Sequence, residues 1–337
     1  MRTGAQTIRP LVLPKIQAIG GSKLSPILYV VIPCYNEEKV LEETTSRLTV
    51  KLDQLTADGI IAADSRILYV DDCSRDSTWT LIQSLHERHP RIAAIRLSHN
   101  RGQQIALVAG LLEARKHAEV VISMDADLQD DIGVLGDFIT EYHKGAHVVY
   151  GVRSKREKDT VFKRSTAGGF YKISKKMGLE IVANHAEYRL MSRQVLDCLA
   201  EYPETNFFLR GVISSIGFKT AVVYYERQNR FAGETKYSPG KLMALAFEAI
   251  TSFSVKPLRF ITFTGLTIAL LSLLAFLVVV VLCATRVLGE AWPIWLSSLW
   301  LLGGIQLSAL GLVGEYIGKA YAETKRRPKY FIDESIG

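Results

Sequence analysis

Residues 120–131 read VVISMDADLQDD, a stretch that indicates both a buried strand and a polar site. It begins as an apolar run typical of a buried strand and ends in acidic residues. Asp125 and Asp127 are expected to place two carboxylates in one cleft, where a cation between them would relieve their repulsion. Such oxygen ligands suit Mg²⁺ or Mn²⁺ held partly by the phosphates of a substrate. The alternative is an acidic turn that caps the next helix.

Other uses of an acidic strand end are disfavoured. An EF-hand loop starting at Asp125 needs Gly at its sixth position and Glu at its twelfth, where the chain has Asp130 and Gly136. An aspartyl-phosphate enzyme would need partners for its nucleophile that the sequence does not reveal. No G-x-G-x-x-G follows the first expected strand, so a dinucleotide fold is also disfavoured.

Strands and helices are expected to alternate from residue 27 onward. The apolar runs predict strands at 27–33, 67–71, 92–97, 120–124 and 147–152. Helical spacing of apolar residues predicts helices at 38–55 and 103–117. Between them, a further helix should run from a cap at Asp76 or Ser77 to residue 89. This alternation predicts an α/β fold, a mostly parallel sheet with helices on both faces. Ligands should then bind beyond the carboxyl ends of the strands.

Polar residues follow three of these strands. The three ends read Pro33-Cys34-Tyr35-Asn36-Glu37-Glu38, Asp71-Asp72-Cys73-Ser74 and Asp125-Ala126-Asp127. Asp71 or Asp72 can accept hydrogen bonds from a base or a ribose, and Tyr35 offers a face for stacking. A cap or a turn explains each acid singly, but three acidic strand ends in one sheet are harder to explain in this way.

Two long uncharged stretches lie near the C-terminus. The first has 26 residues between Arg259 and Arg286, and the second has 24 between Glu290 and Glu315. A membrane span needs about 20 apolar residues, so both are expected to cross as a helical hairpin. Residues 241–256 are expected to lie on the lipid surface, with a packed core helix as the alternative. A small face in the second span would pack protomers together, and consists of Gly304, Ser308 and Gly311.

The net charge of +7 is concentrated at the two ends of the chain. Residues 1–25 carry four basic and no acidic side chains, and residues 319–330 carry five basic side chains and one acidic one. The nearly neutral body argues against a nucleic-acid partner, and the basic ends favour anionic lipid. Positive-inside bias then places both termini and the sheet in the cytoplasm, at the inner membrane. The four scattered cysteines fit a reducing compartment.

A phosphate-bearing acceptor would need cations, and arginine binds phosphate in a bidentate manner. The candidates are spread along the second half of the sheet domain: Arg164, Arg189, Arg210, Arg230 and Lys236. Arg189 and Arg210 are favoured because each lies in a locally apolar segment.

Six motifs occur in the order VVIPCYNEE, YVDDCSRDST, LSHNRGQQIAL, MDADLQDD, VVYGVR and YRLMSR. In this order they resemble family 2 glycosyltransferases of the GT-A fold. The similarity is closest to membrane-anchored polyprenyl-phosphate glycosyltransferases of the bactoprenol glucosyltransferase type, to which dolichol-phosphate mannose synthase is related. It extends from about Ile27 to Ile332, and the block from Gly311 to Ile332 is particularly specific.

The resemblance implies a set of site residues. Those expected to hold the nucleotide sugar are Pro33, Tyr35, Glu37, Asp71, Asp72, Asp125 and Ala126. The expected metal ligands are Asp125, Asp127 and Gln129, and the expected catalytic residues are Asp127, Glu187 and Arg189.

Two residues depart from the family pattern. The family often has Gly where Cys73 stands, and it usually has Asp where this chain has Glu187. Glu187 is expected to orient a cation such as Arg189, with the role of general base as the alternative, because a phosphate acceptor has little proton to remove near pH 7.

The expected function is metal-dependent, inverting transfer of a sugar to undecaprenyl phosphate from a nucleotide diphosphate sugar, with UDP-glucose favoured. N-acetylglucosamine or mannose as the sugar, or a non-catalytic scaffold that binds nucleotide sugar, are the alternatives. A processive polysaccharide synthase is disfavoured because Q-x-x-R-W is missing. The expected organisation is a basic arm at 1–25, a catalytic domain at 26–240, an interfacial helix at 241–256, a transmembrane hairpin at 257–318 and a basic tail at 319–337.

Overall fold

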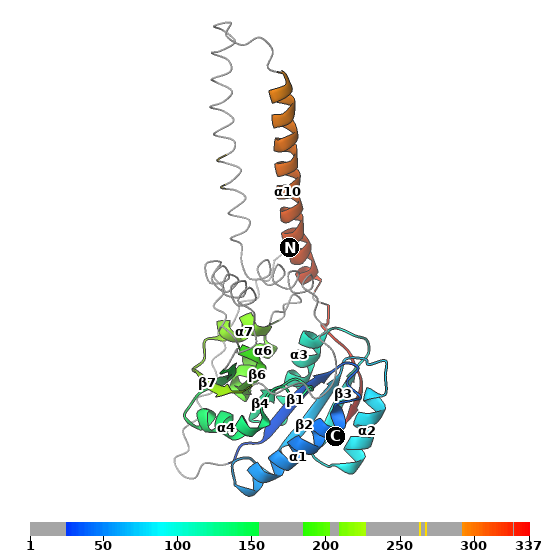
Figure 1. Cartoon of the computed structure of the whole chain (residues 1–337), viewed down its shortest axis with the longest axis vertical. Helices are drawn as coiled ribbons and strands as arrows, with labels where there is room; N and C mark the ends of the chain where they lie inside the picture. The colour runs from blue at the N-terminus through cyan, green and yellow to red at the C-terminus, as the bar shows by residue number, and fades with distance from the viewer. Residues whose placement is uncertain are drawn as a thin grey trace, which may run out of the picture.

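A computed structural model describes residues 25–154, 185–202, 209–226, 263, 267, 292–325 and 327–337. Within these residues, eight strands form one sheet in the order β7-β5-β6-β4-β1-β2-β3-β8 (Figure 1). The strands are β1 (Leu28–Cys34), β2 (Arg66–Asp71), β3 (Ile92–Leu97), β4 (Val120–Ser123), β5 (Val148–Arg153), β6 (His185–Ser192), β7 (Thr220–Tyr225) and β8 (Ile332–Ile336).

The centre of the sheet is parallel, as the alternation predicts. β3, β2, β1 and β4 run side by side in one direction, and each of the five predicted strands is present within one or two residues. Two strands that the sequence did not predict are antiparallel to their neighbours. β6 runs between β4 and β5, and β8 pairs with β3 at the sheet edge. The sheet is therefore mixed, with a parallel centre and two antiparallel strands.

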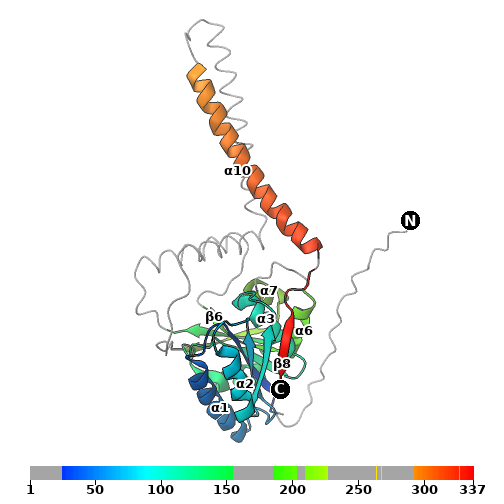
Figure 2. The same ribbon diagram turned by 90° about the vertical axis from the view of Figure 1, so that its right-hand side faces the viewer.

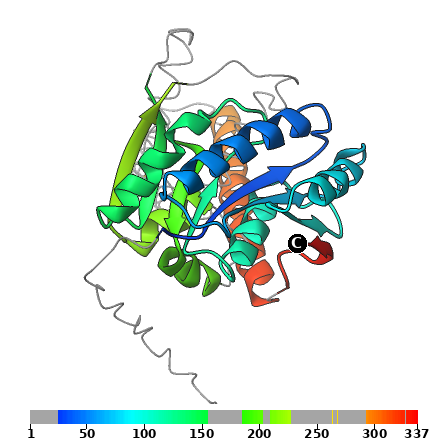
Figure 3. The ribbon, with the colours of Figure 1, turned by 90° about the horizontal axis from the view of Figure 1, so that it is seen from below.

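Helices cover both faces of this sheet, which confirms the predicted layers (Figure 3). One face packs against α1 (Leu41–Ala57), α2 (Thr78–Arg88) and α4 (Leu135–His143), and the other against α3 (Gln103–Ala114), α6 (Arg193–Ala200) and α7 (Leu209–Ile216). β1 is buried along its whole length and contributes alternate residues to the two cores. This burial on both faces explains its unbroken apolar sequence.

Gly110 lets α3 approach the centre of the sheet closely. A Cβ atom at this position would lie 2.5 Å from a methyl group of Val31 and 2.5 Å from one of Val70. Both valines belong to central strands and cannot move aside without disturbing the sheet. Glycine is therefore required here by packing, although it is unfavourable in the interior of a helix.

We expect Gly110→Ala to lower the free energy of unfolding by about 1–3 kcal/mol, because the added methyl group overpacks the core. The measurement is the midpoint of chemical denaturation, followed by circular dichroism. Gly136→Ala in α4 is the matched control, since its Cβ would meet Leu55 at 3.4 Å. The control should be neutral or slightly stabilising. Equal midpoints for Gly110→Ala and the wild type would contradict the packing argument.

The longest helix, α10 (Trp292–Thr324), extends away from the sheet (Figures 1 and 2). Several of its large apolar side chains are exposed, among them Trp295, Leu299, Leu310 and Ile317. No helix within the described residues is both long enough and apolar enough to cross a membrane. The first predicted span lies outside these residues except for 263 and 267, as do most of the predicted basic arm and the whole predicted interfacial helix.

The chain returns to the sheet after α10. Residues 332–336 form β8, whose residues pair with β3 from Ala94 to Leu97 (Figure 2). The sequence predicted only a basic tail for residues 319–337. The C-terminal strand is instead an integral edge of the sheet.

Candidate active site

The three polar strand ends lie together, as predicted. β4, β1 and β2 are neighbours and run in the same direction, so the residues that follow them share one edge of the sheet. The loop after β1 is tied to the loop after β2, because Asn36 N donates to Ser74 Oγ at 3.0 Å and Arg75 N donates to Asn36 Oδ1 at 2.9 Å. The hydroxyl of Thr44 in α1 donates to the carbonyl of Ala126 at 2.9 Å.

Asp125 lies at the centre of an excess of negative charge. Burial and the neighbouring carboxylates of Asp130, Glu187 and Asp127 together raise the pKa of Asp125 to about 7. One of its oxygens accepts a hydrogen bond of 2.7 Å from Gln103 Nε2 at the start of α3. The site therefore favours a positive charge close to Asp125.

The oxygen donors near Asp125 fit the predicted divalent cation. No three His, Cys, Asp or Glu side chains in the described parts of the chain are grouped so as to hold a metal by themselves. Magnesium, however, is commonly bound by one or two carboxylates together with substrate phosphates. Asp125, Asp127 and Gln129 supply such oxygens, and their assignment as ligands stays a prediction.

The helix-capping alternative belongs to a different acid of the same stretch. Asp131 Oδ1 accepts a hydrogen bond of 2.8 Å from Gly133 N and so caps the short helix η1 (Ile132–Val134). Asp127 accepts from Gln129 N at 3.2 Å within the turn. Leu128, between these two residues, adopts a φ of 56°, which is uncommon for a residue other than glycine. The acidic stretch thus combines one capping residue with a sharply turned loop.

The sequence pattern does not assign Asp130 to the site. It is nevertheless the most deeply buried acid of residues 120–131, at 2% exposure. Its Oδ1 accepts from the Tyr225 hydroxyl at 2.5 Å and lies 3.6 Å from Arg153 Nη2. Its Oδ2 is buried and has no hydrogen-bond partner among the described residues. Burial raises the pKa of Asp130, while Tyr225 and Arg153 oppose that increase. These contacts join the acidic loop to the ends of β5 and β7.

Arg189 is fully buried and lies in β6, where it pairs with Ser123 of β4 and Tyr150 of β5. Its guanidinium forms an ion pair with Glu187, whose other oxygen accepts from Arg210 Nε of α7 at 2.7 Å. The structure therefore brings together three of the residues that the sequence assigned to catalysis or to the acceptor phosphate, Glu187, Arg189 and Arg210. Arg164, Arg230 and Lys236 lie outside the described residues.

Two nitrogens of Arg189, Nε and Nη1, are buried without a hydrogen-bond partner in the described part of the chain. Burial lowers the pKa of Arg189 and the charge of Glu187 raises it. A buried cation with unused donors is costly unless a ligand satisfies them. A phosphate group has the charge and the acceptor oxygens to do so.

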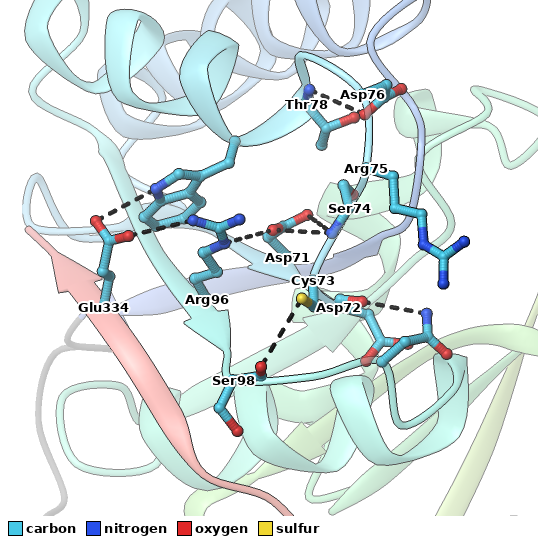
Figure 4. A network of polar contacts seen from close by, with 12 residues as sticks. Asp71, Asp72, Cys73, Ser74, Arg75, Asp76, Thr78, Arg96, Ser98 and Glu334 are labelled. Atoms are coloured by element: carbon cyan, nitrogen blue, oxygen red, sulfur yellow. Dashed lines mark hydrogen bonds and ion pairs between the residues drawn. The ribbon is translucent and has the colours of Figure 1, made fainter.

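Asp71 and Asp72 already have partners within the protein (Figure 4). Asp71 is fully buried, accepts from Ser74 N at 3.2 Å and lies 3.4 Å from Arg96 Nε. Asp72 accepts from Arg101 N at 2.7 Å and Gly102 N at 2.8 Å. The two carboxylates therefore shape the loops at this edge. Direct contact with a nucleotide stays a prediction for them, as for Pro33, Tyr35 and Glu37.

Cys73, between Asp72 and Ser74, adopts a φ of 56°. Glycine reaches this left-handed conformation without the steric cost that a side chain imposes. The structure thus supplies a physical reason for the glycine that the family often has at this position. The cysteine keeps the same turn at some conformational cost.

The family model described as "Glycosyl transferase family 2" matches residues 29–200, about half of the chain. The chain belongs to glycosyl transferase family 2. The family 2 match covers β1 to β6 and therefore the acidic loop, Glu187 and Arg189. Membership makes the protein a glycosyltransferase, and the mixed sheet with helices on both faces agrees with the predicted GT-A fold.

Several family 2 relatives match over most of their length. The glycosyltransferase YkoT of Bacillus subtilis (strain 168) is 48% identical over 308 residues, which are 91% of each chain. The bactoprenol glucosyl transferase of Shigella phage SfII is 38% identical over 91% of this chain and 97% of its own. The prophage bactoprenol glucosyl transferase homolog of Escherichia coli (strain K12) is 37% identical over 90% of this chain and 97% of its own.

Proposed function

We propose that this glycosyltransferase transfers a sugar from a nucleotide diphosphate sugar to the phosphate of a polyprenyl lipid, most simply undecaprenyl phosphate, with inversion at the anomeric carbon. Relatives named bactoprenol glucosyl transferase support this acceptor and favour glucose as the sugar. The observation that carries the proposal is the buried Arg189, with two unused donors, beside an acidic cluster suited to a cation. One centre would bind the acceptor phosphate and the other the donor diphosphate.

Each residue of the site has a distinct role in this proposal. A divalent cation held by Asp125, Asp127 and Gln129 would offset the charge that develops on the leaving diphosphate. Arg189 and Arg210 orient the acceptor phosphate, which is mostly a dianion near pH 7 and needs little deprotonation. Glu187 contacts both arginines and holds them in place. Repulsion between Glu187 and the phosphate is limited because these cations lie between them.

The test of the proposed function uses a labelled nucleotide sugar and undecaprenyl phosphate with the purified full chain. Label that moves into a butanol-extractable lipid supports the enzyme. Binding of the sugar nucleotide with no turnover on any donor would favour the non-catalytic scaffold. Parallel reactions with UDP-glucose, UDP-N-acetylglucosamine and GDP-mannose identify the sugar, because the transfer rates of the three donors are compared under the same conditions.

The proposal includes a membrane location, supported by sequence alone. The uncharged residues 260–285 and 291–314 are each long enough for a span, and basic residues flank the pair. They would anchor the catalytic sheet at the cytoplasmic face of the inner membrane, where a soluble donor meets a lipid acceptor. Contacts through Gly304, Ser308 and Gly311 would join protomers into a homo-oligomer.

We expect a cysteine introduced at Gly289 to react with a membrane-impermeant thiol reagent added outside the cell. A cysteine introduced at Asp333 should react only after the membrane is permeabilised. The reason is that the charge bias places the loop of residues 286–290 outside and the sheet inside. The unsubstituted chain, with its four native cysteines, is the control. External labelling at Asp333 alone would overturn the proposed orientation.

A further inference from the structure

The C-terminal segment, residues 327–337, contacts the loop of residues 98–102 directly and is connected to Asp71 through Arg96. Its strand β8 pairs with β3, and Glu334 lies opposite Arg96 in that pairing. β3 leads directly into the loop of residues 98–102, which precedes α3. Figure 4 shows Arg96 between Glu334 of the C-terminal segment and Asp71, which the sequence assigns to the donor site.

The first connection runs through Arg96. Glu334 Oε1 accepts from Arg96 Nη1 at 3.3 Å, and Glu334 Oε2 accepts from the indole of Trp79 at 3.3 Å. The guanidinium lies over the Trp79 ring, 5.7 Å from its centre. Arg96 Nε faces Asp71 Oδ2 at 3.4 Å and has no hydrogen-bond partner among the described residues. Glu334 and Trp79 therefore hold the only cation that forms an ion pair with Asp71 in the described structure.

The second connection runs through the loop of residues 98–102. Ser98 N donates to the carbonyl of Phe331 at 3.0 Å, and Arg101 Nε donates to the carbonyl of Lys329 at 2.8 Å. Arg101 also donates its backbone N–H to Asp72. The C-terminal segment therefore reaches both aspartates through residues that it holds in place.

We propose that Glu334 is a positioning residue for the donor nucleotide, acting through Arg96 on Asp71 and the turn that follows it. This inference rests on the proposed function, in which that turn binds the nucleotide. Asp71 is fully buried, so a cation beside it is needed to keep its charge and the turn in one arrangement. Arg96 is 28% exposed and its side chain depends on Glu334 and Trp79 for its orientation.

The partial exposure of the Glu334–Arg96 pair separates its effect on binding from its effect on stability. The side chains are 43% and 28% exposed, and ion pairs of this kind contribute little to folding. A Glu334 variant is therefore expected to fold. Loss of the Glu334 charge should instead lower the affinity for the nucleotide, because that affinity depends on the orientation of Arg96.

The experiment compares Glu334→Gln with Asp333→Asn, a charge removal at the exposed neighbour on the same strand. Calorimetric titration of the full chain with UDP and Mg²⁺, and separately with GDP, gives the nucleotide Kd. We expect Glu334→Gln to weaken nucleotide binding about tenfold, equivalent to about 1.4 kcal/mol. The donor KM should rise in parallel, with kcat and the acceptor KM within about twofold of wild type. Asp333→Asn should match the wild type in each measurement.

A double-mutant cycle with Arg96→Met tests the route. If Glu334 acts through Arg96, Glu334→Gln should weaken nucleotide binding no further in the Arg96→Met background. An unchanged Kd for Glu334→Gln, or an equal loss in both backgrounds, would overturn the inference. A wild-type chain that binds neither UDP nor GDP would instead refute the proposed donor, so the two failures are distinguishable. Thermal unfolding of each variant confirms that binding is compared between folded proteins.

Discussion

Asp127→Asn is expected to lower sugar transfer about 10³-fold while leaving the protein folded. The substitution keeps the shape of the side chain and its capacity to accept from Gln129 N, but it removes a charge from the predicted metal site. Metal ions contribute several kcal/mol to such reactions, and each 1.36 kcal/mol corresponds to about tenfold in rate. The measurement is the initial rate with saturating donor and acceptor, alongside circular dichroism to check the fold.

Asp131→Asn is the matched control for this experiment. It removes a charge from the same acidic stretch, but Asp131 caps η1, and asparagine caps helices equally well. The control should stay within about threefold of the wild type. Treatment with EDTA should reproduce the loss seen in Asp127→Asn, and added Mg²⁺ or Mn²⁺ should restore the rate. Full activity in EDTA would refute the metal site.

Glu187→Ala is expected to lose more than about 10²-fold in kcat/KM for the lipid acceptor, and Glu187→Gln less than that. Glu187 forms ion pairs with Arg189 and Arg210, and the Arg189 side chain is fully buried. Removing the Glu187 carboxylate takes away the ion-pair partner that Arg189 has among the described residues, and breaking a buried pair costs about 3–5 kcal/mol. Part of this cost should appear as a lower melting temperature. Glutamine keeps the hydrogen-bond acceptor that orients both arginines.

The two variants also decide between the two roles for Glu187. A general base contributes typically 10²–10⁴-fold, and glutamine cannot replace it. A positioning role predicts that Glu187→Gln retains activity and raises the acceptor KM more than it lowers kcat. A folded Glu187→Gln protein that binds donor but is as inactive as Asp127→Asn would establish the base.

The parallel centre of the fold could be predicted because its signal is local. Strands such as β1 and β4 are buried on both faces, so their sequences are continuous apolar runs that need no partner to be recognised. The clustering of the acidic strand ends followed from the same pattern, because neighbouring parallel strands end at one edge of the sheet, whereas the roles of these acids stay predictions. The sequence favours Arg189 because a charge inside an apolar segment requires a partner.

The remaining features depend on contacts between segments far apart in the chain. β8 has the short sequence IDESI, whose alternation is too brief to indicate a strand without β3 beside it. The role of Asp130 depends on a hydrogen bond from Tyr225, which lies 95 residues away in sequence. Asp71 and Asp72 were predicted to face a ligand, whereas their buried positions became visible only with the loops that surround them. The local sequence pattern carries no information about contacts between such distant segments.

The pairing of β8 with β3 limits the ways in which residues 227–326 could cross a bilayer, if they anchor the protein as proposed. The chain leaves the sheet after β7 and rejoins the same sheet at β8, so both ends of this intervening segment lie in one compartment. The number of times that the segment crosses a membrane must therefore be even. An odd number of crossings would separate β8 from β3 by the width of the bilayer. A reporter fused after Gly337 should accordingly mark the compartment that holds the sheet and, with it, the proposed donor site.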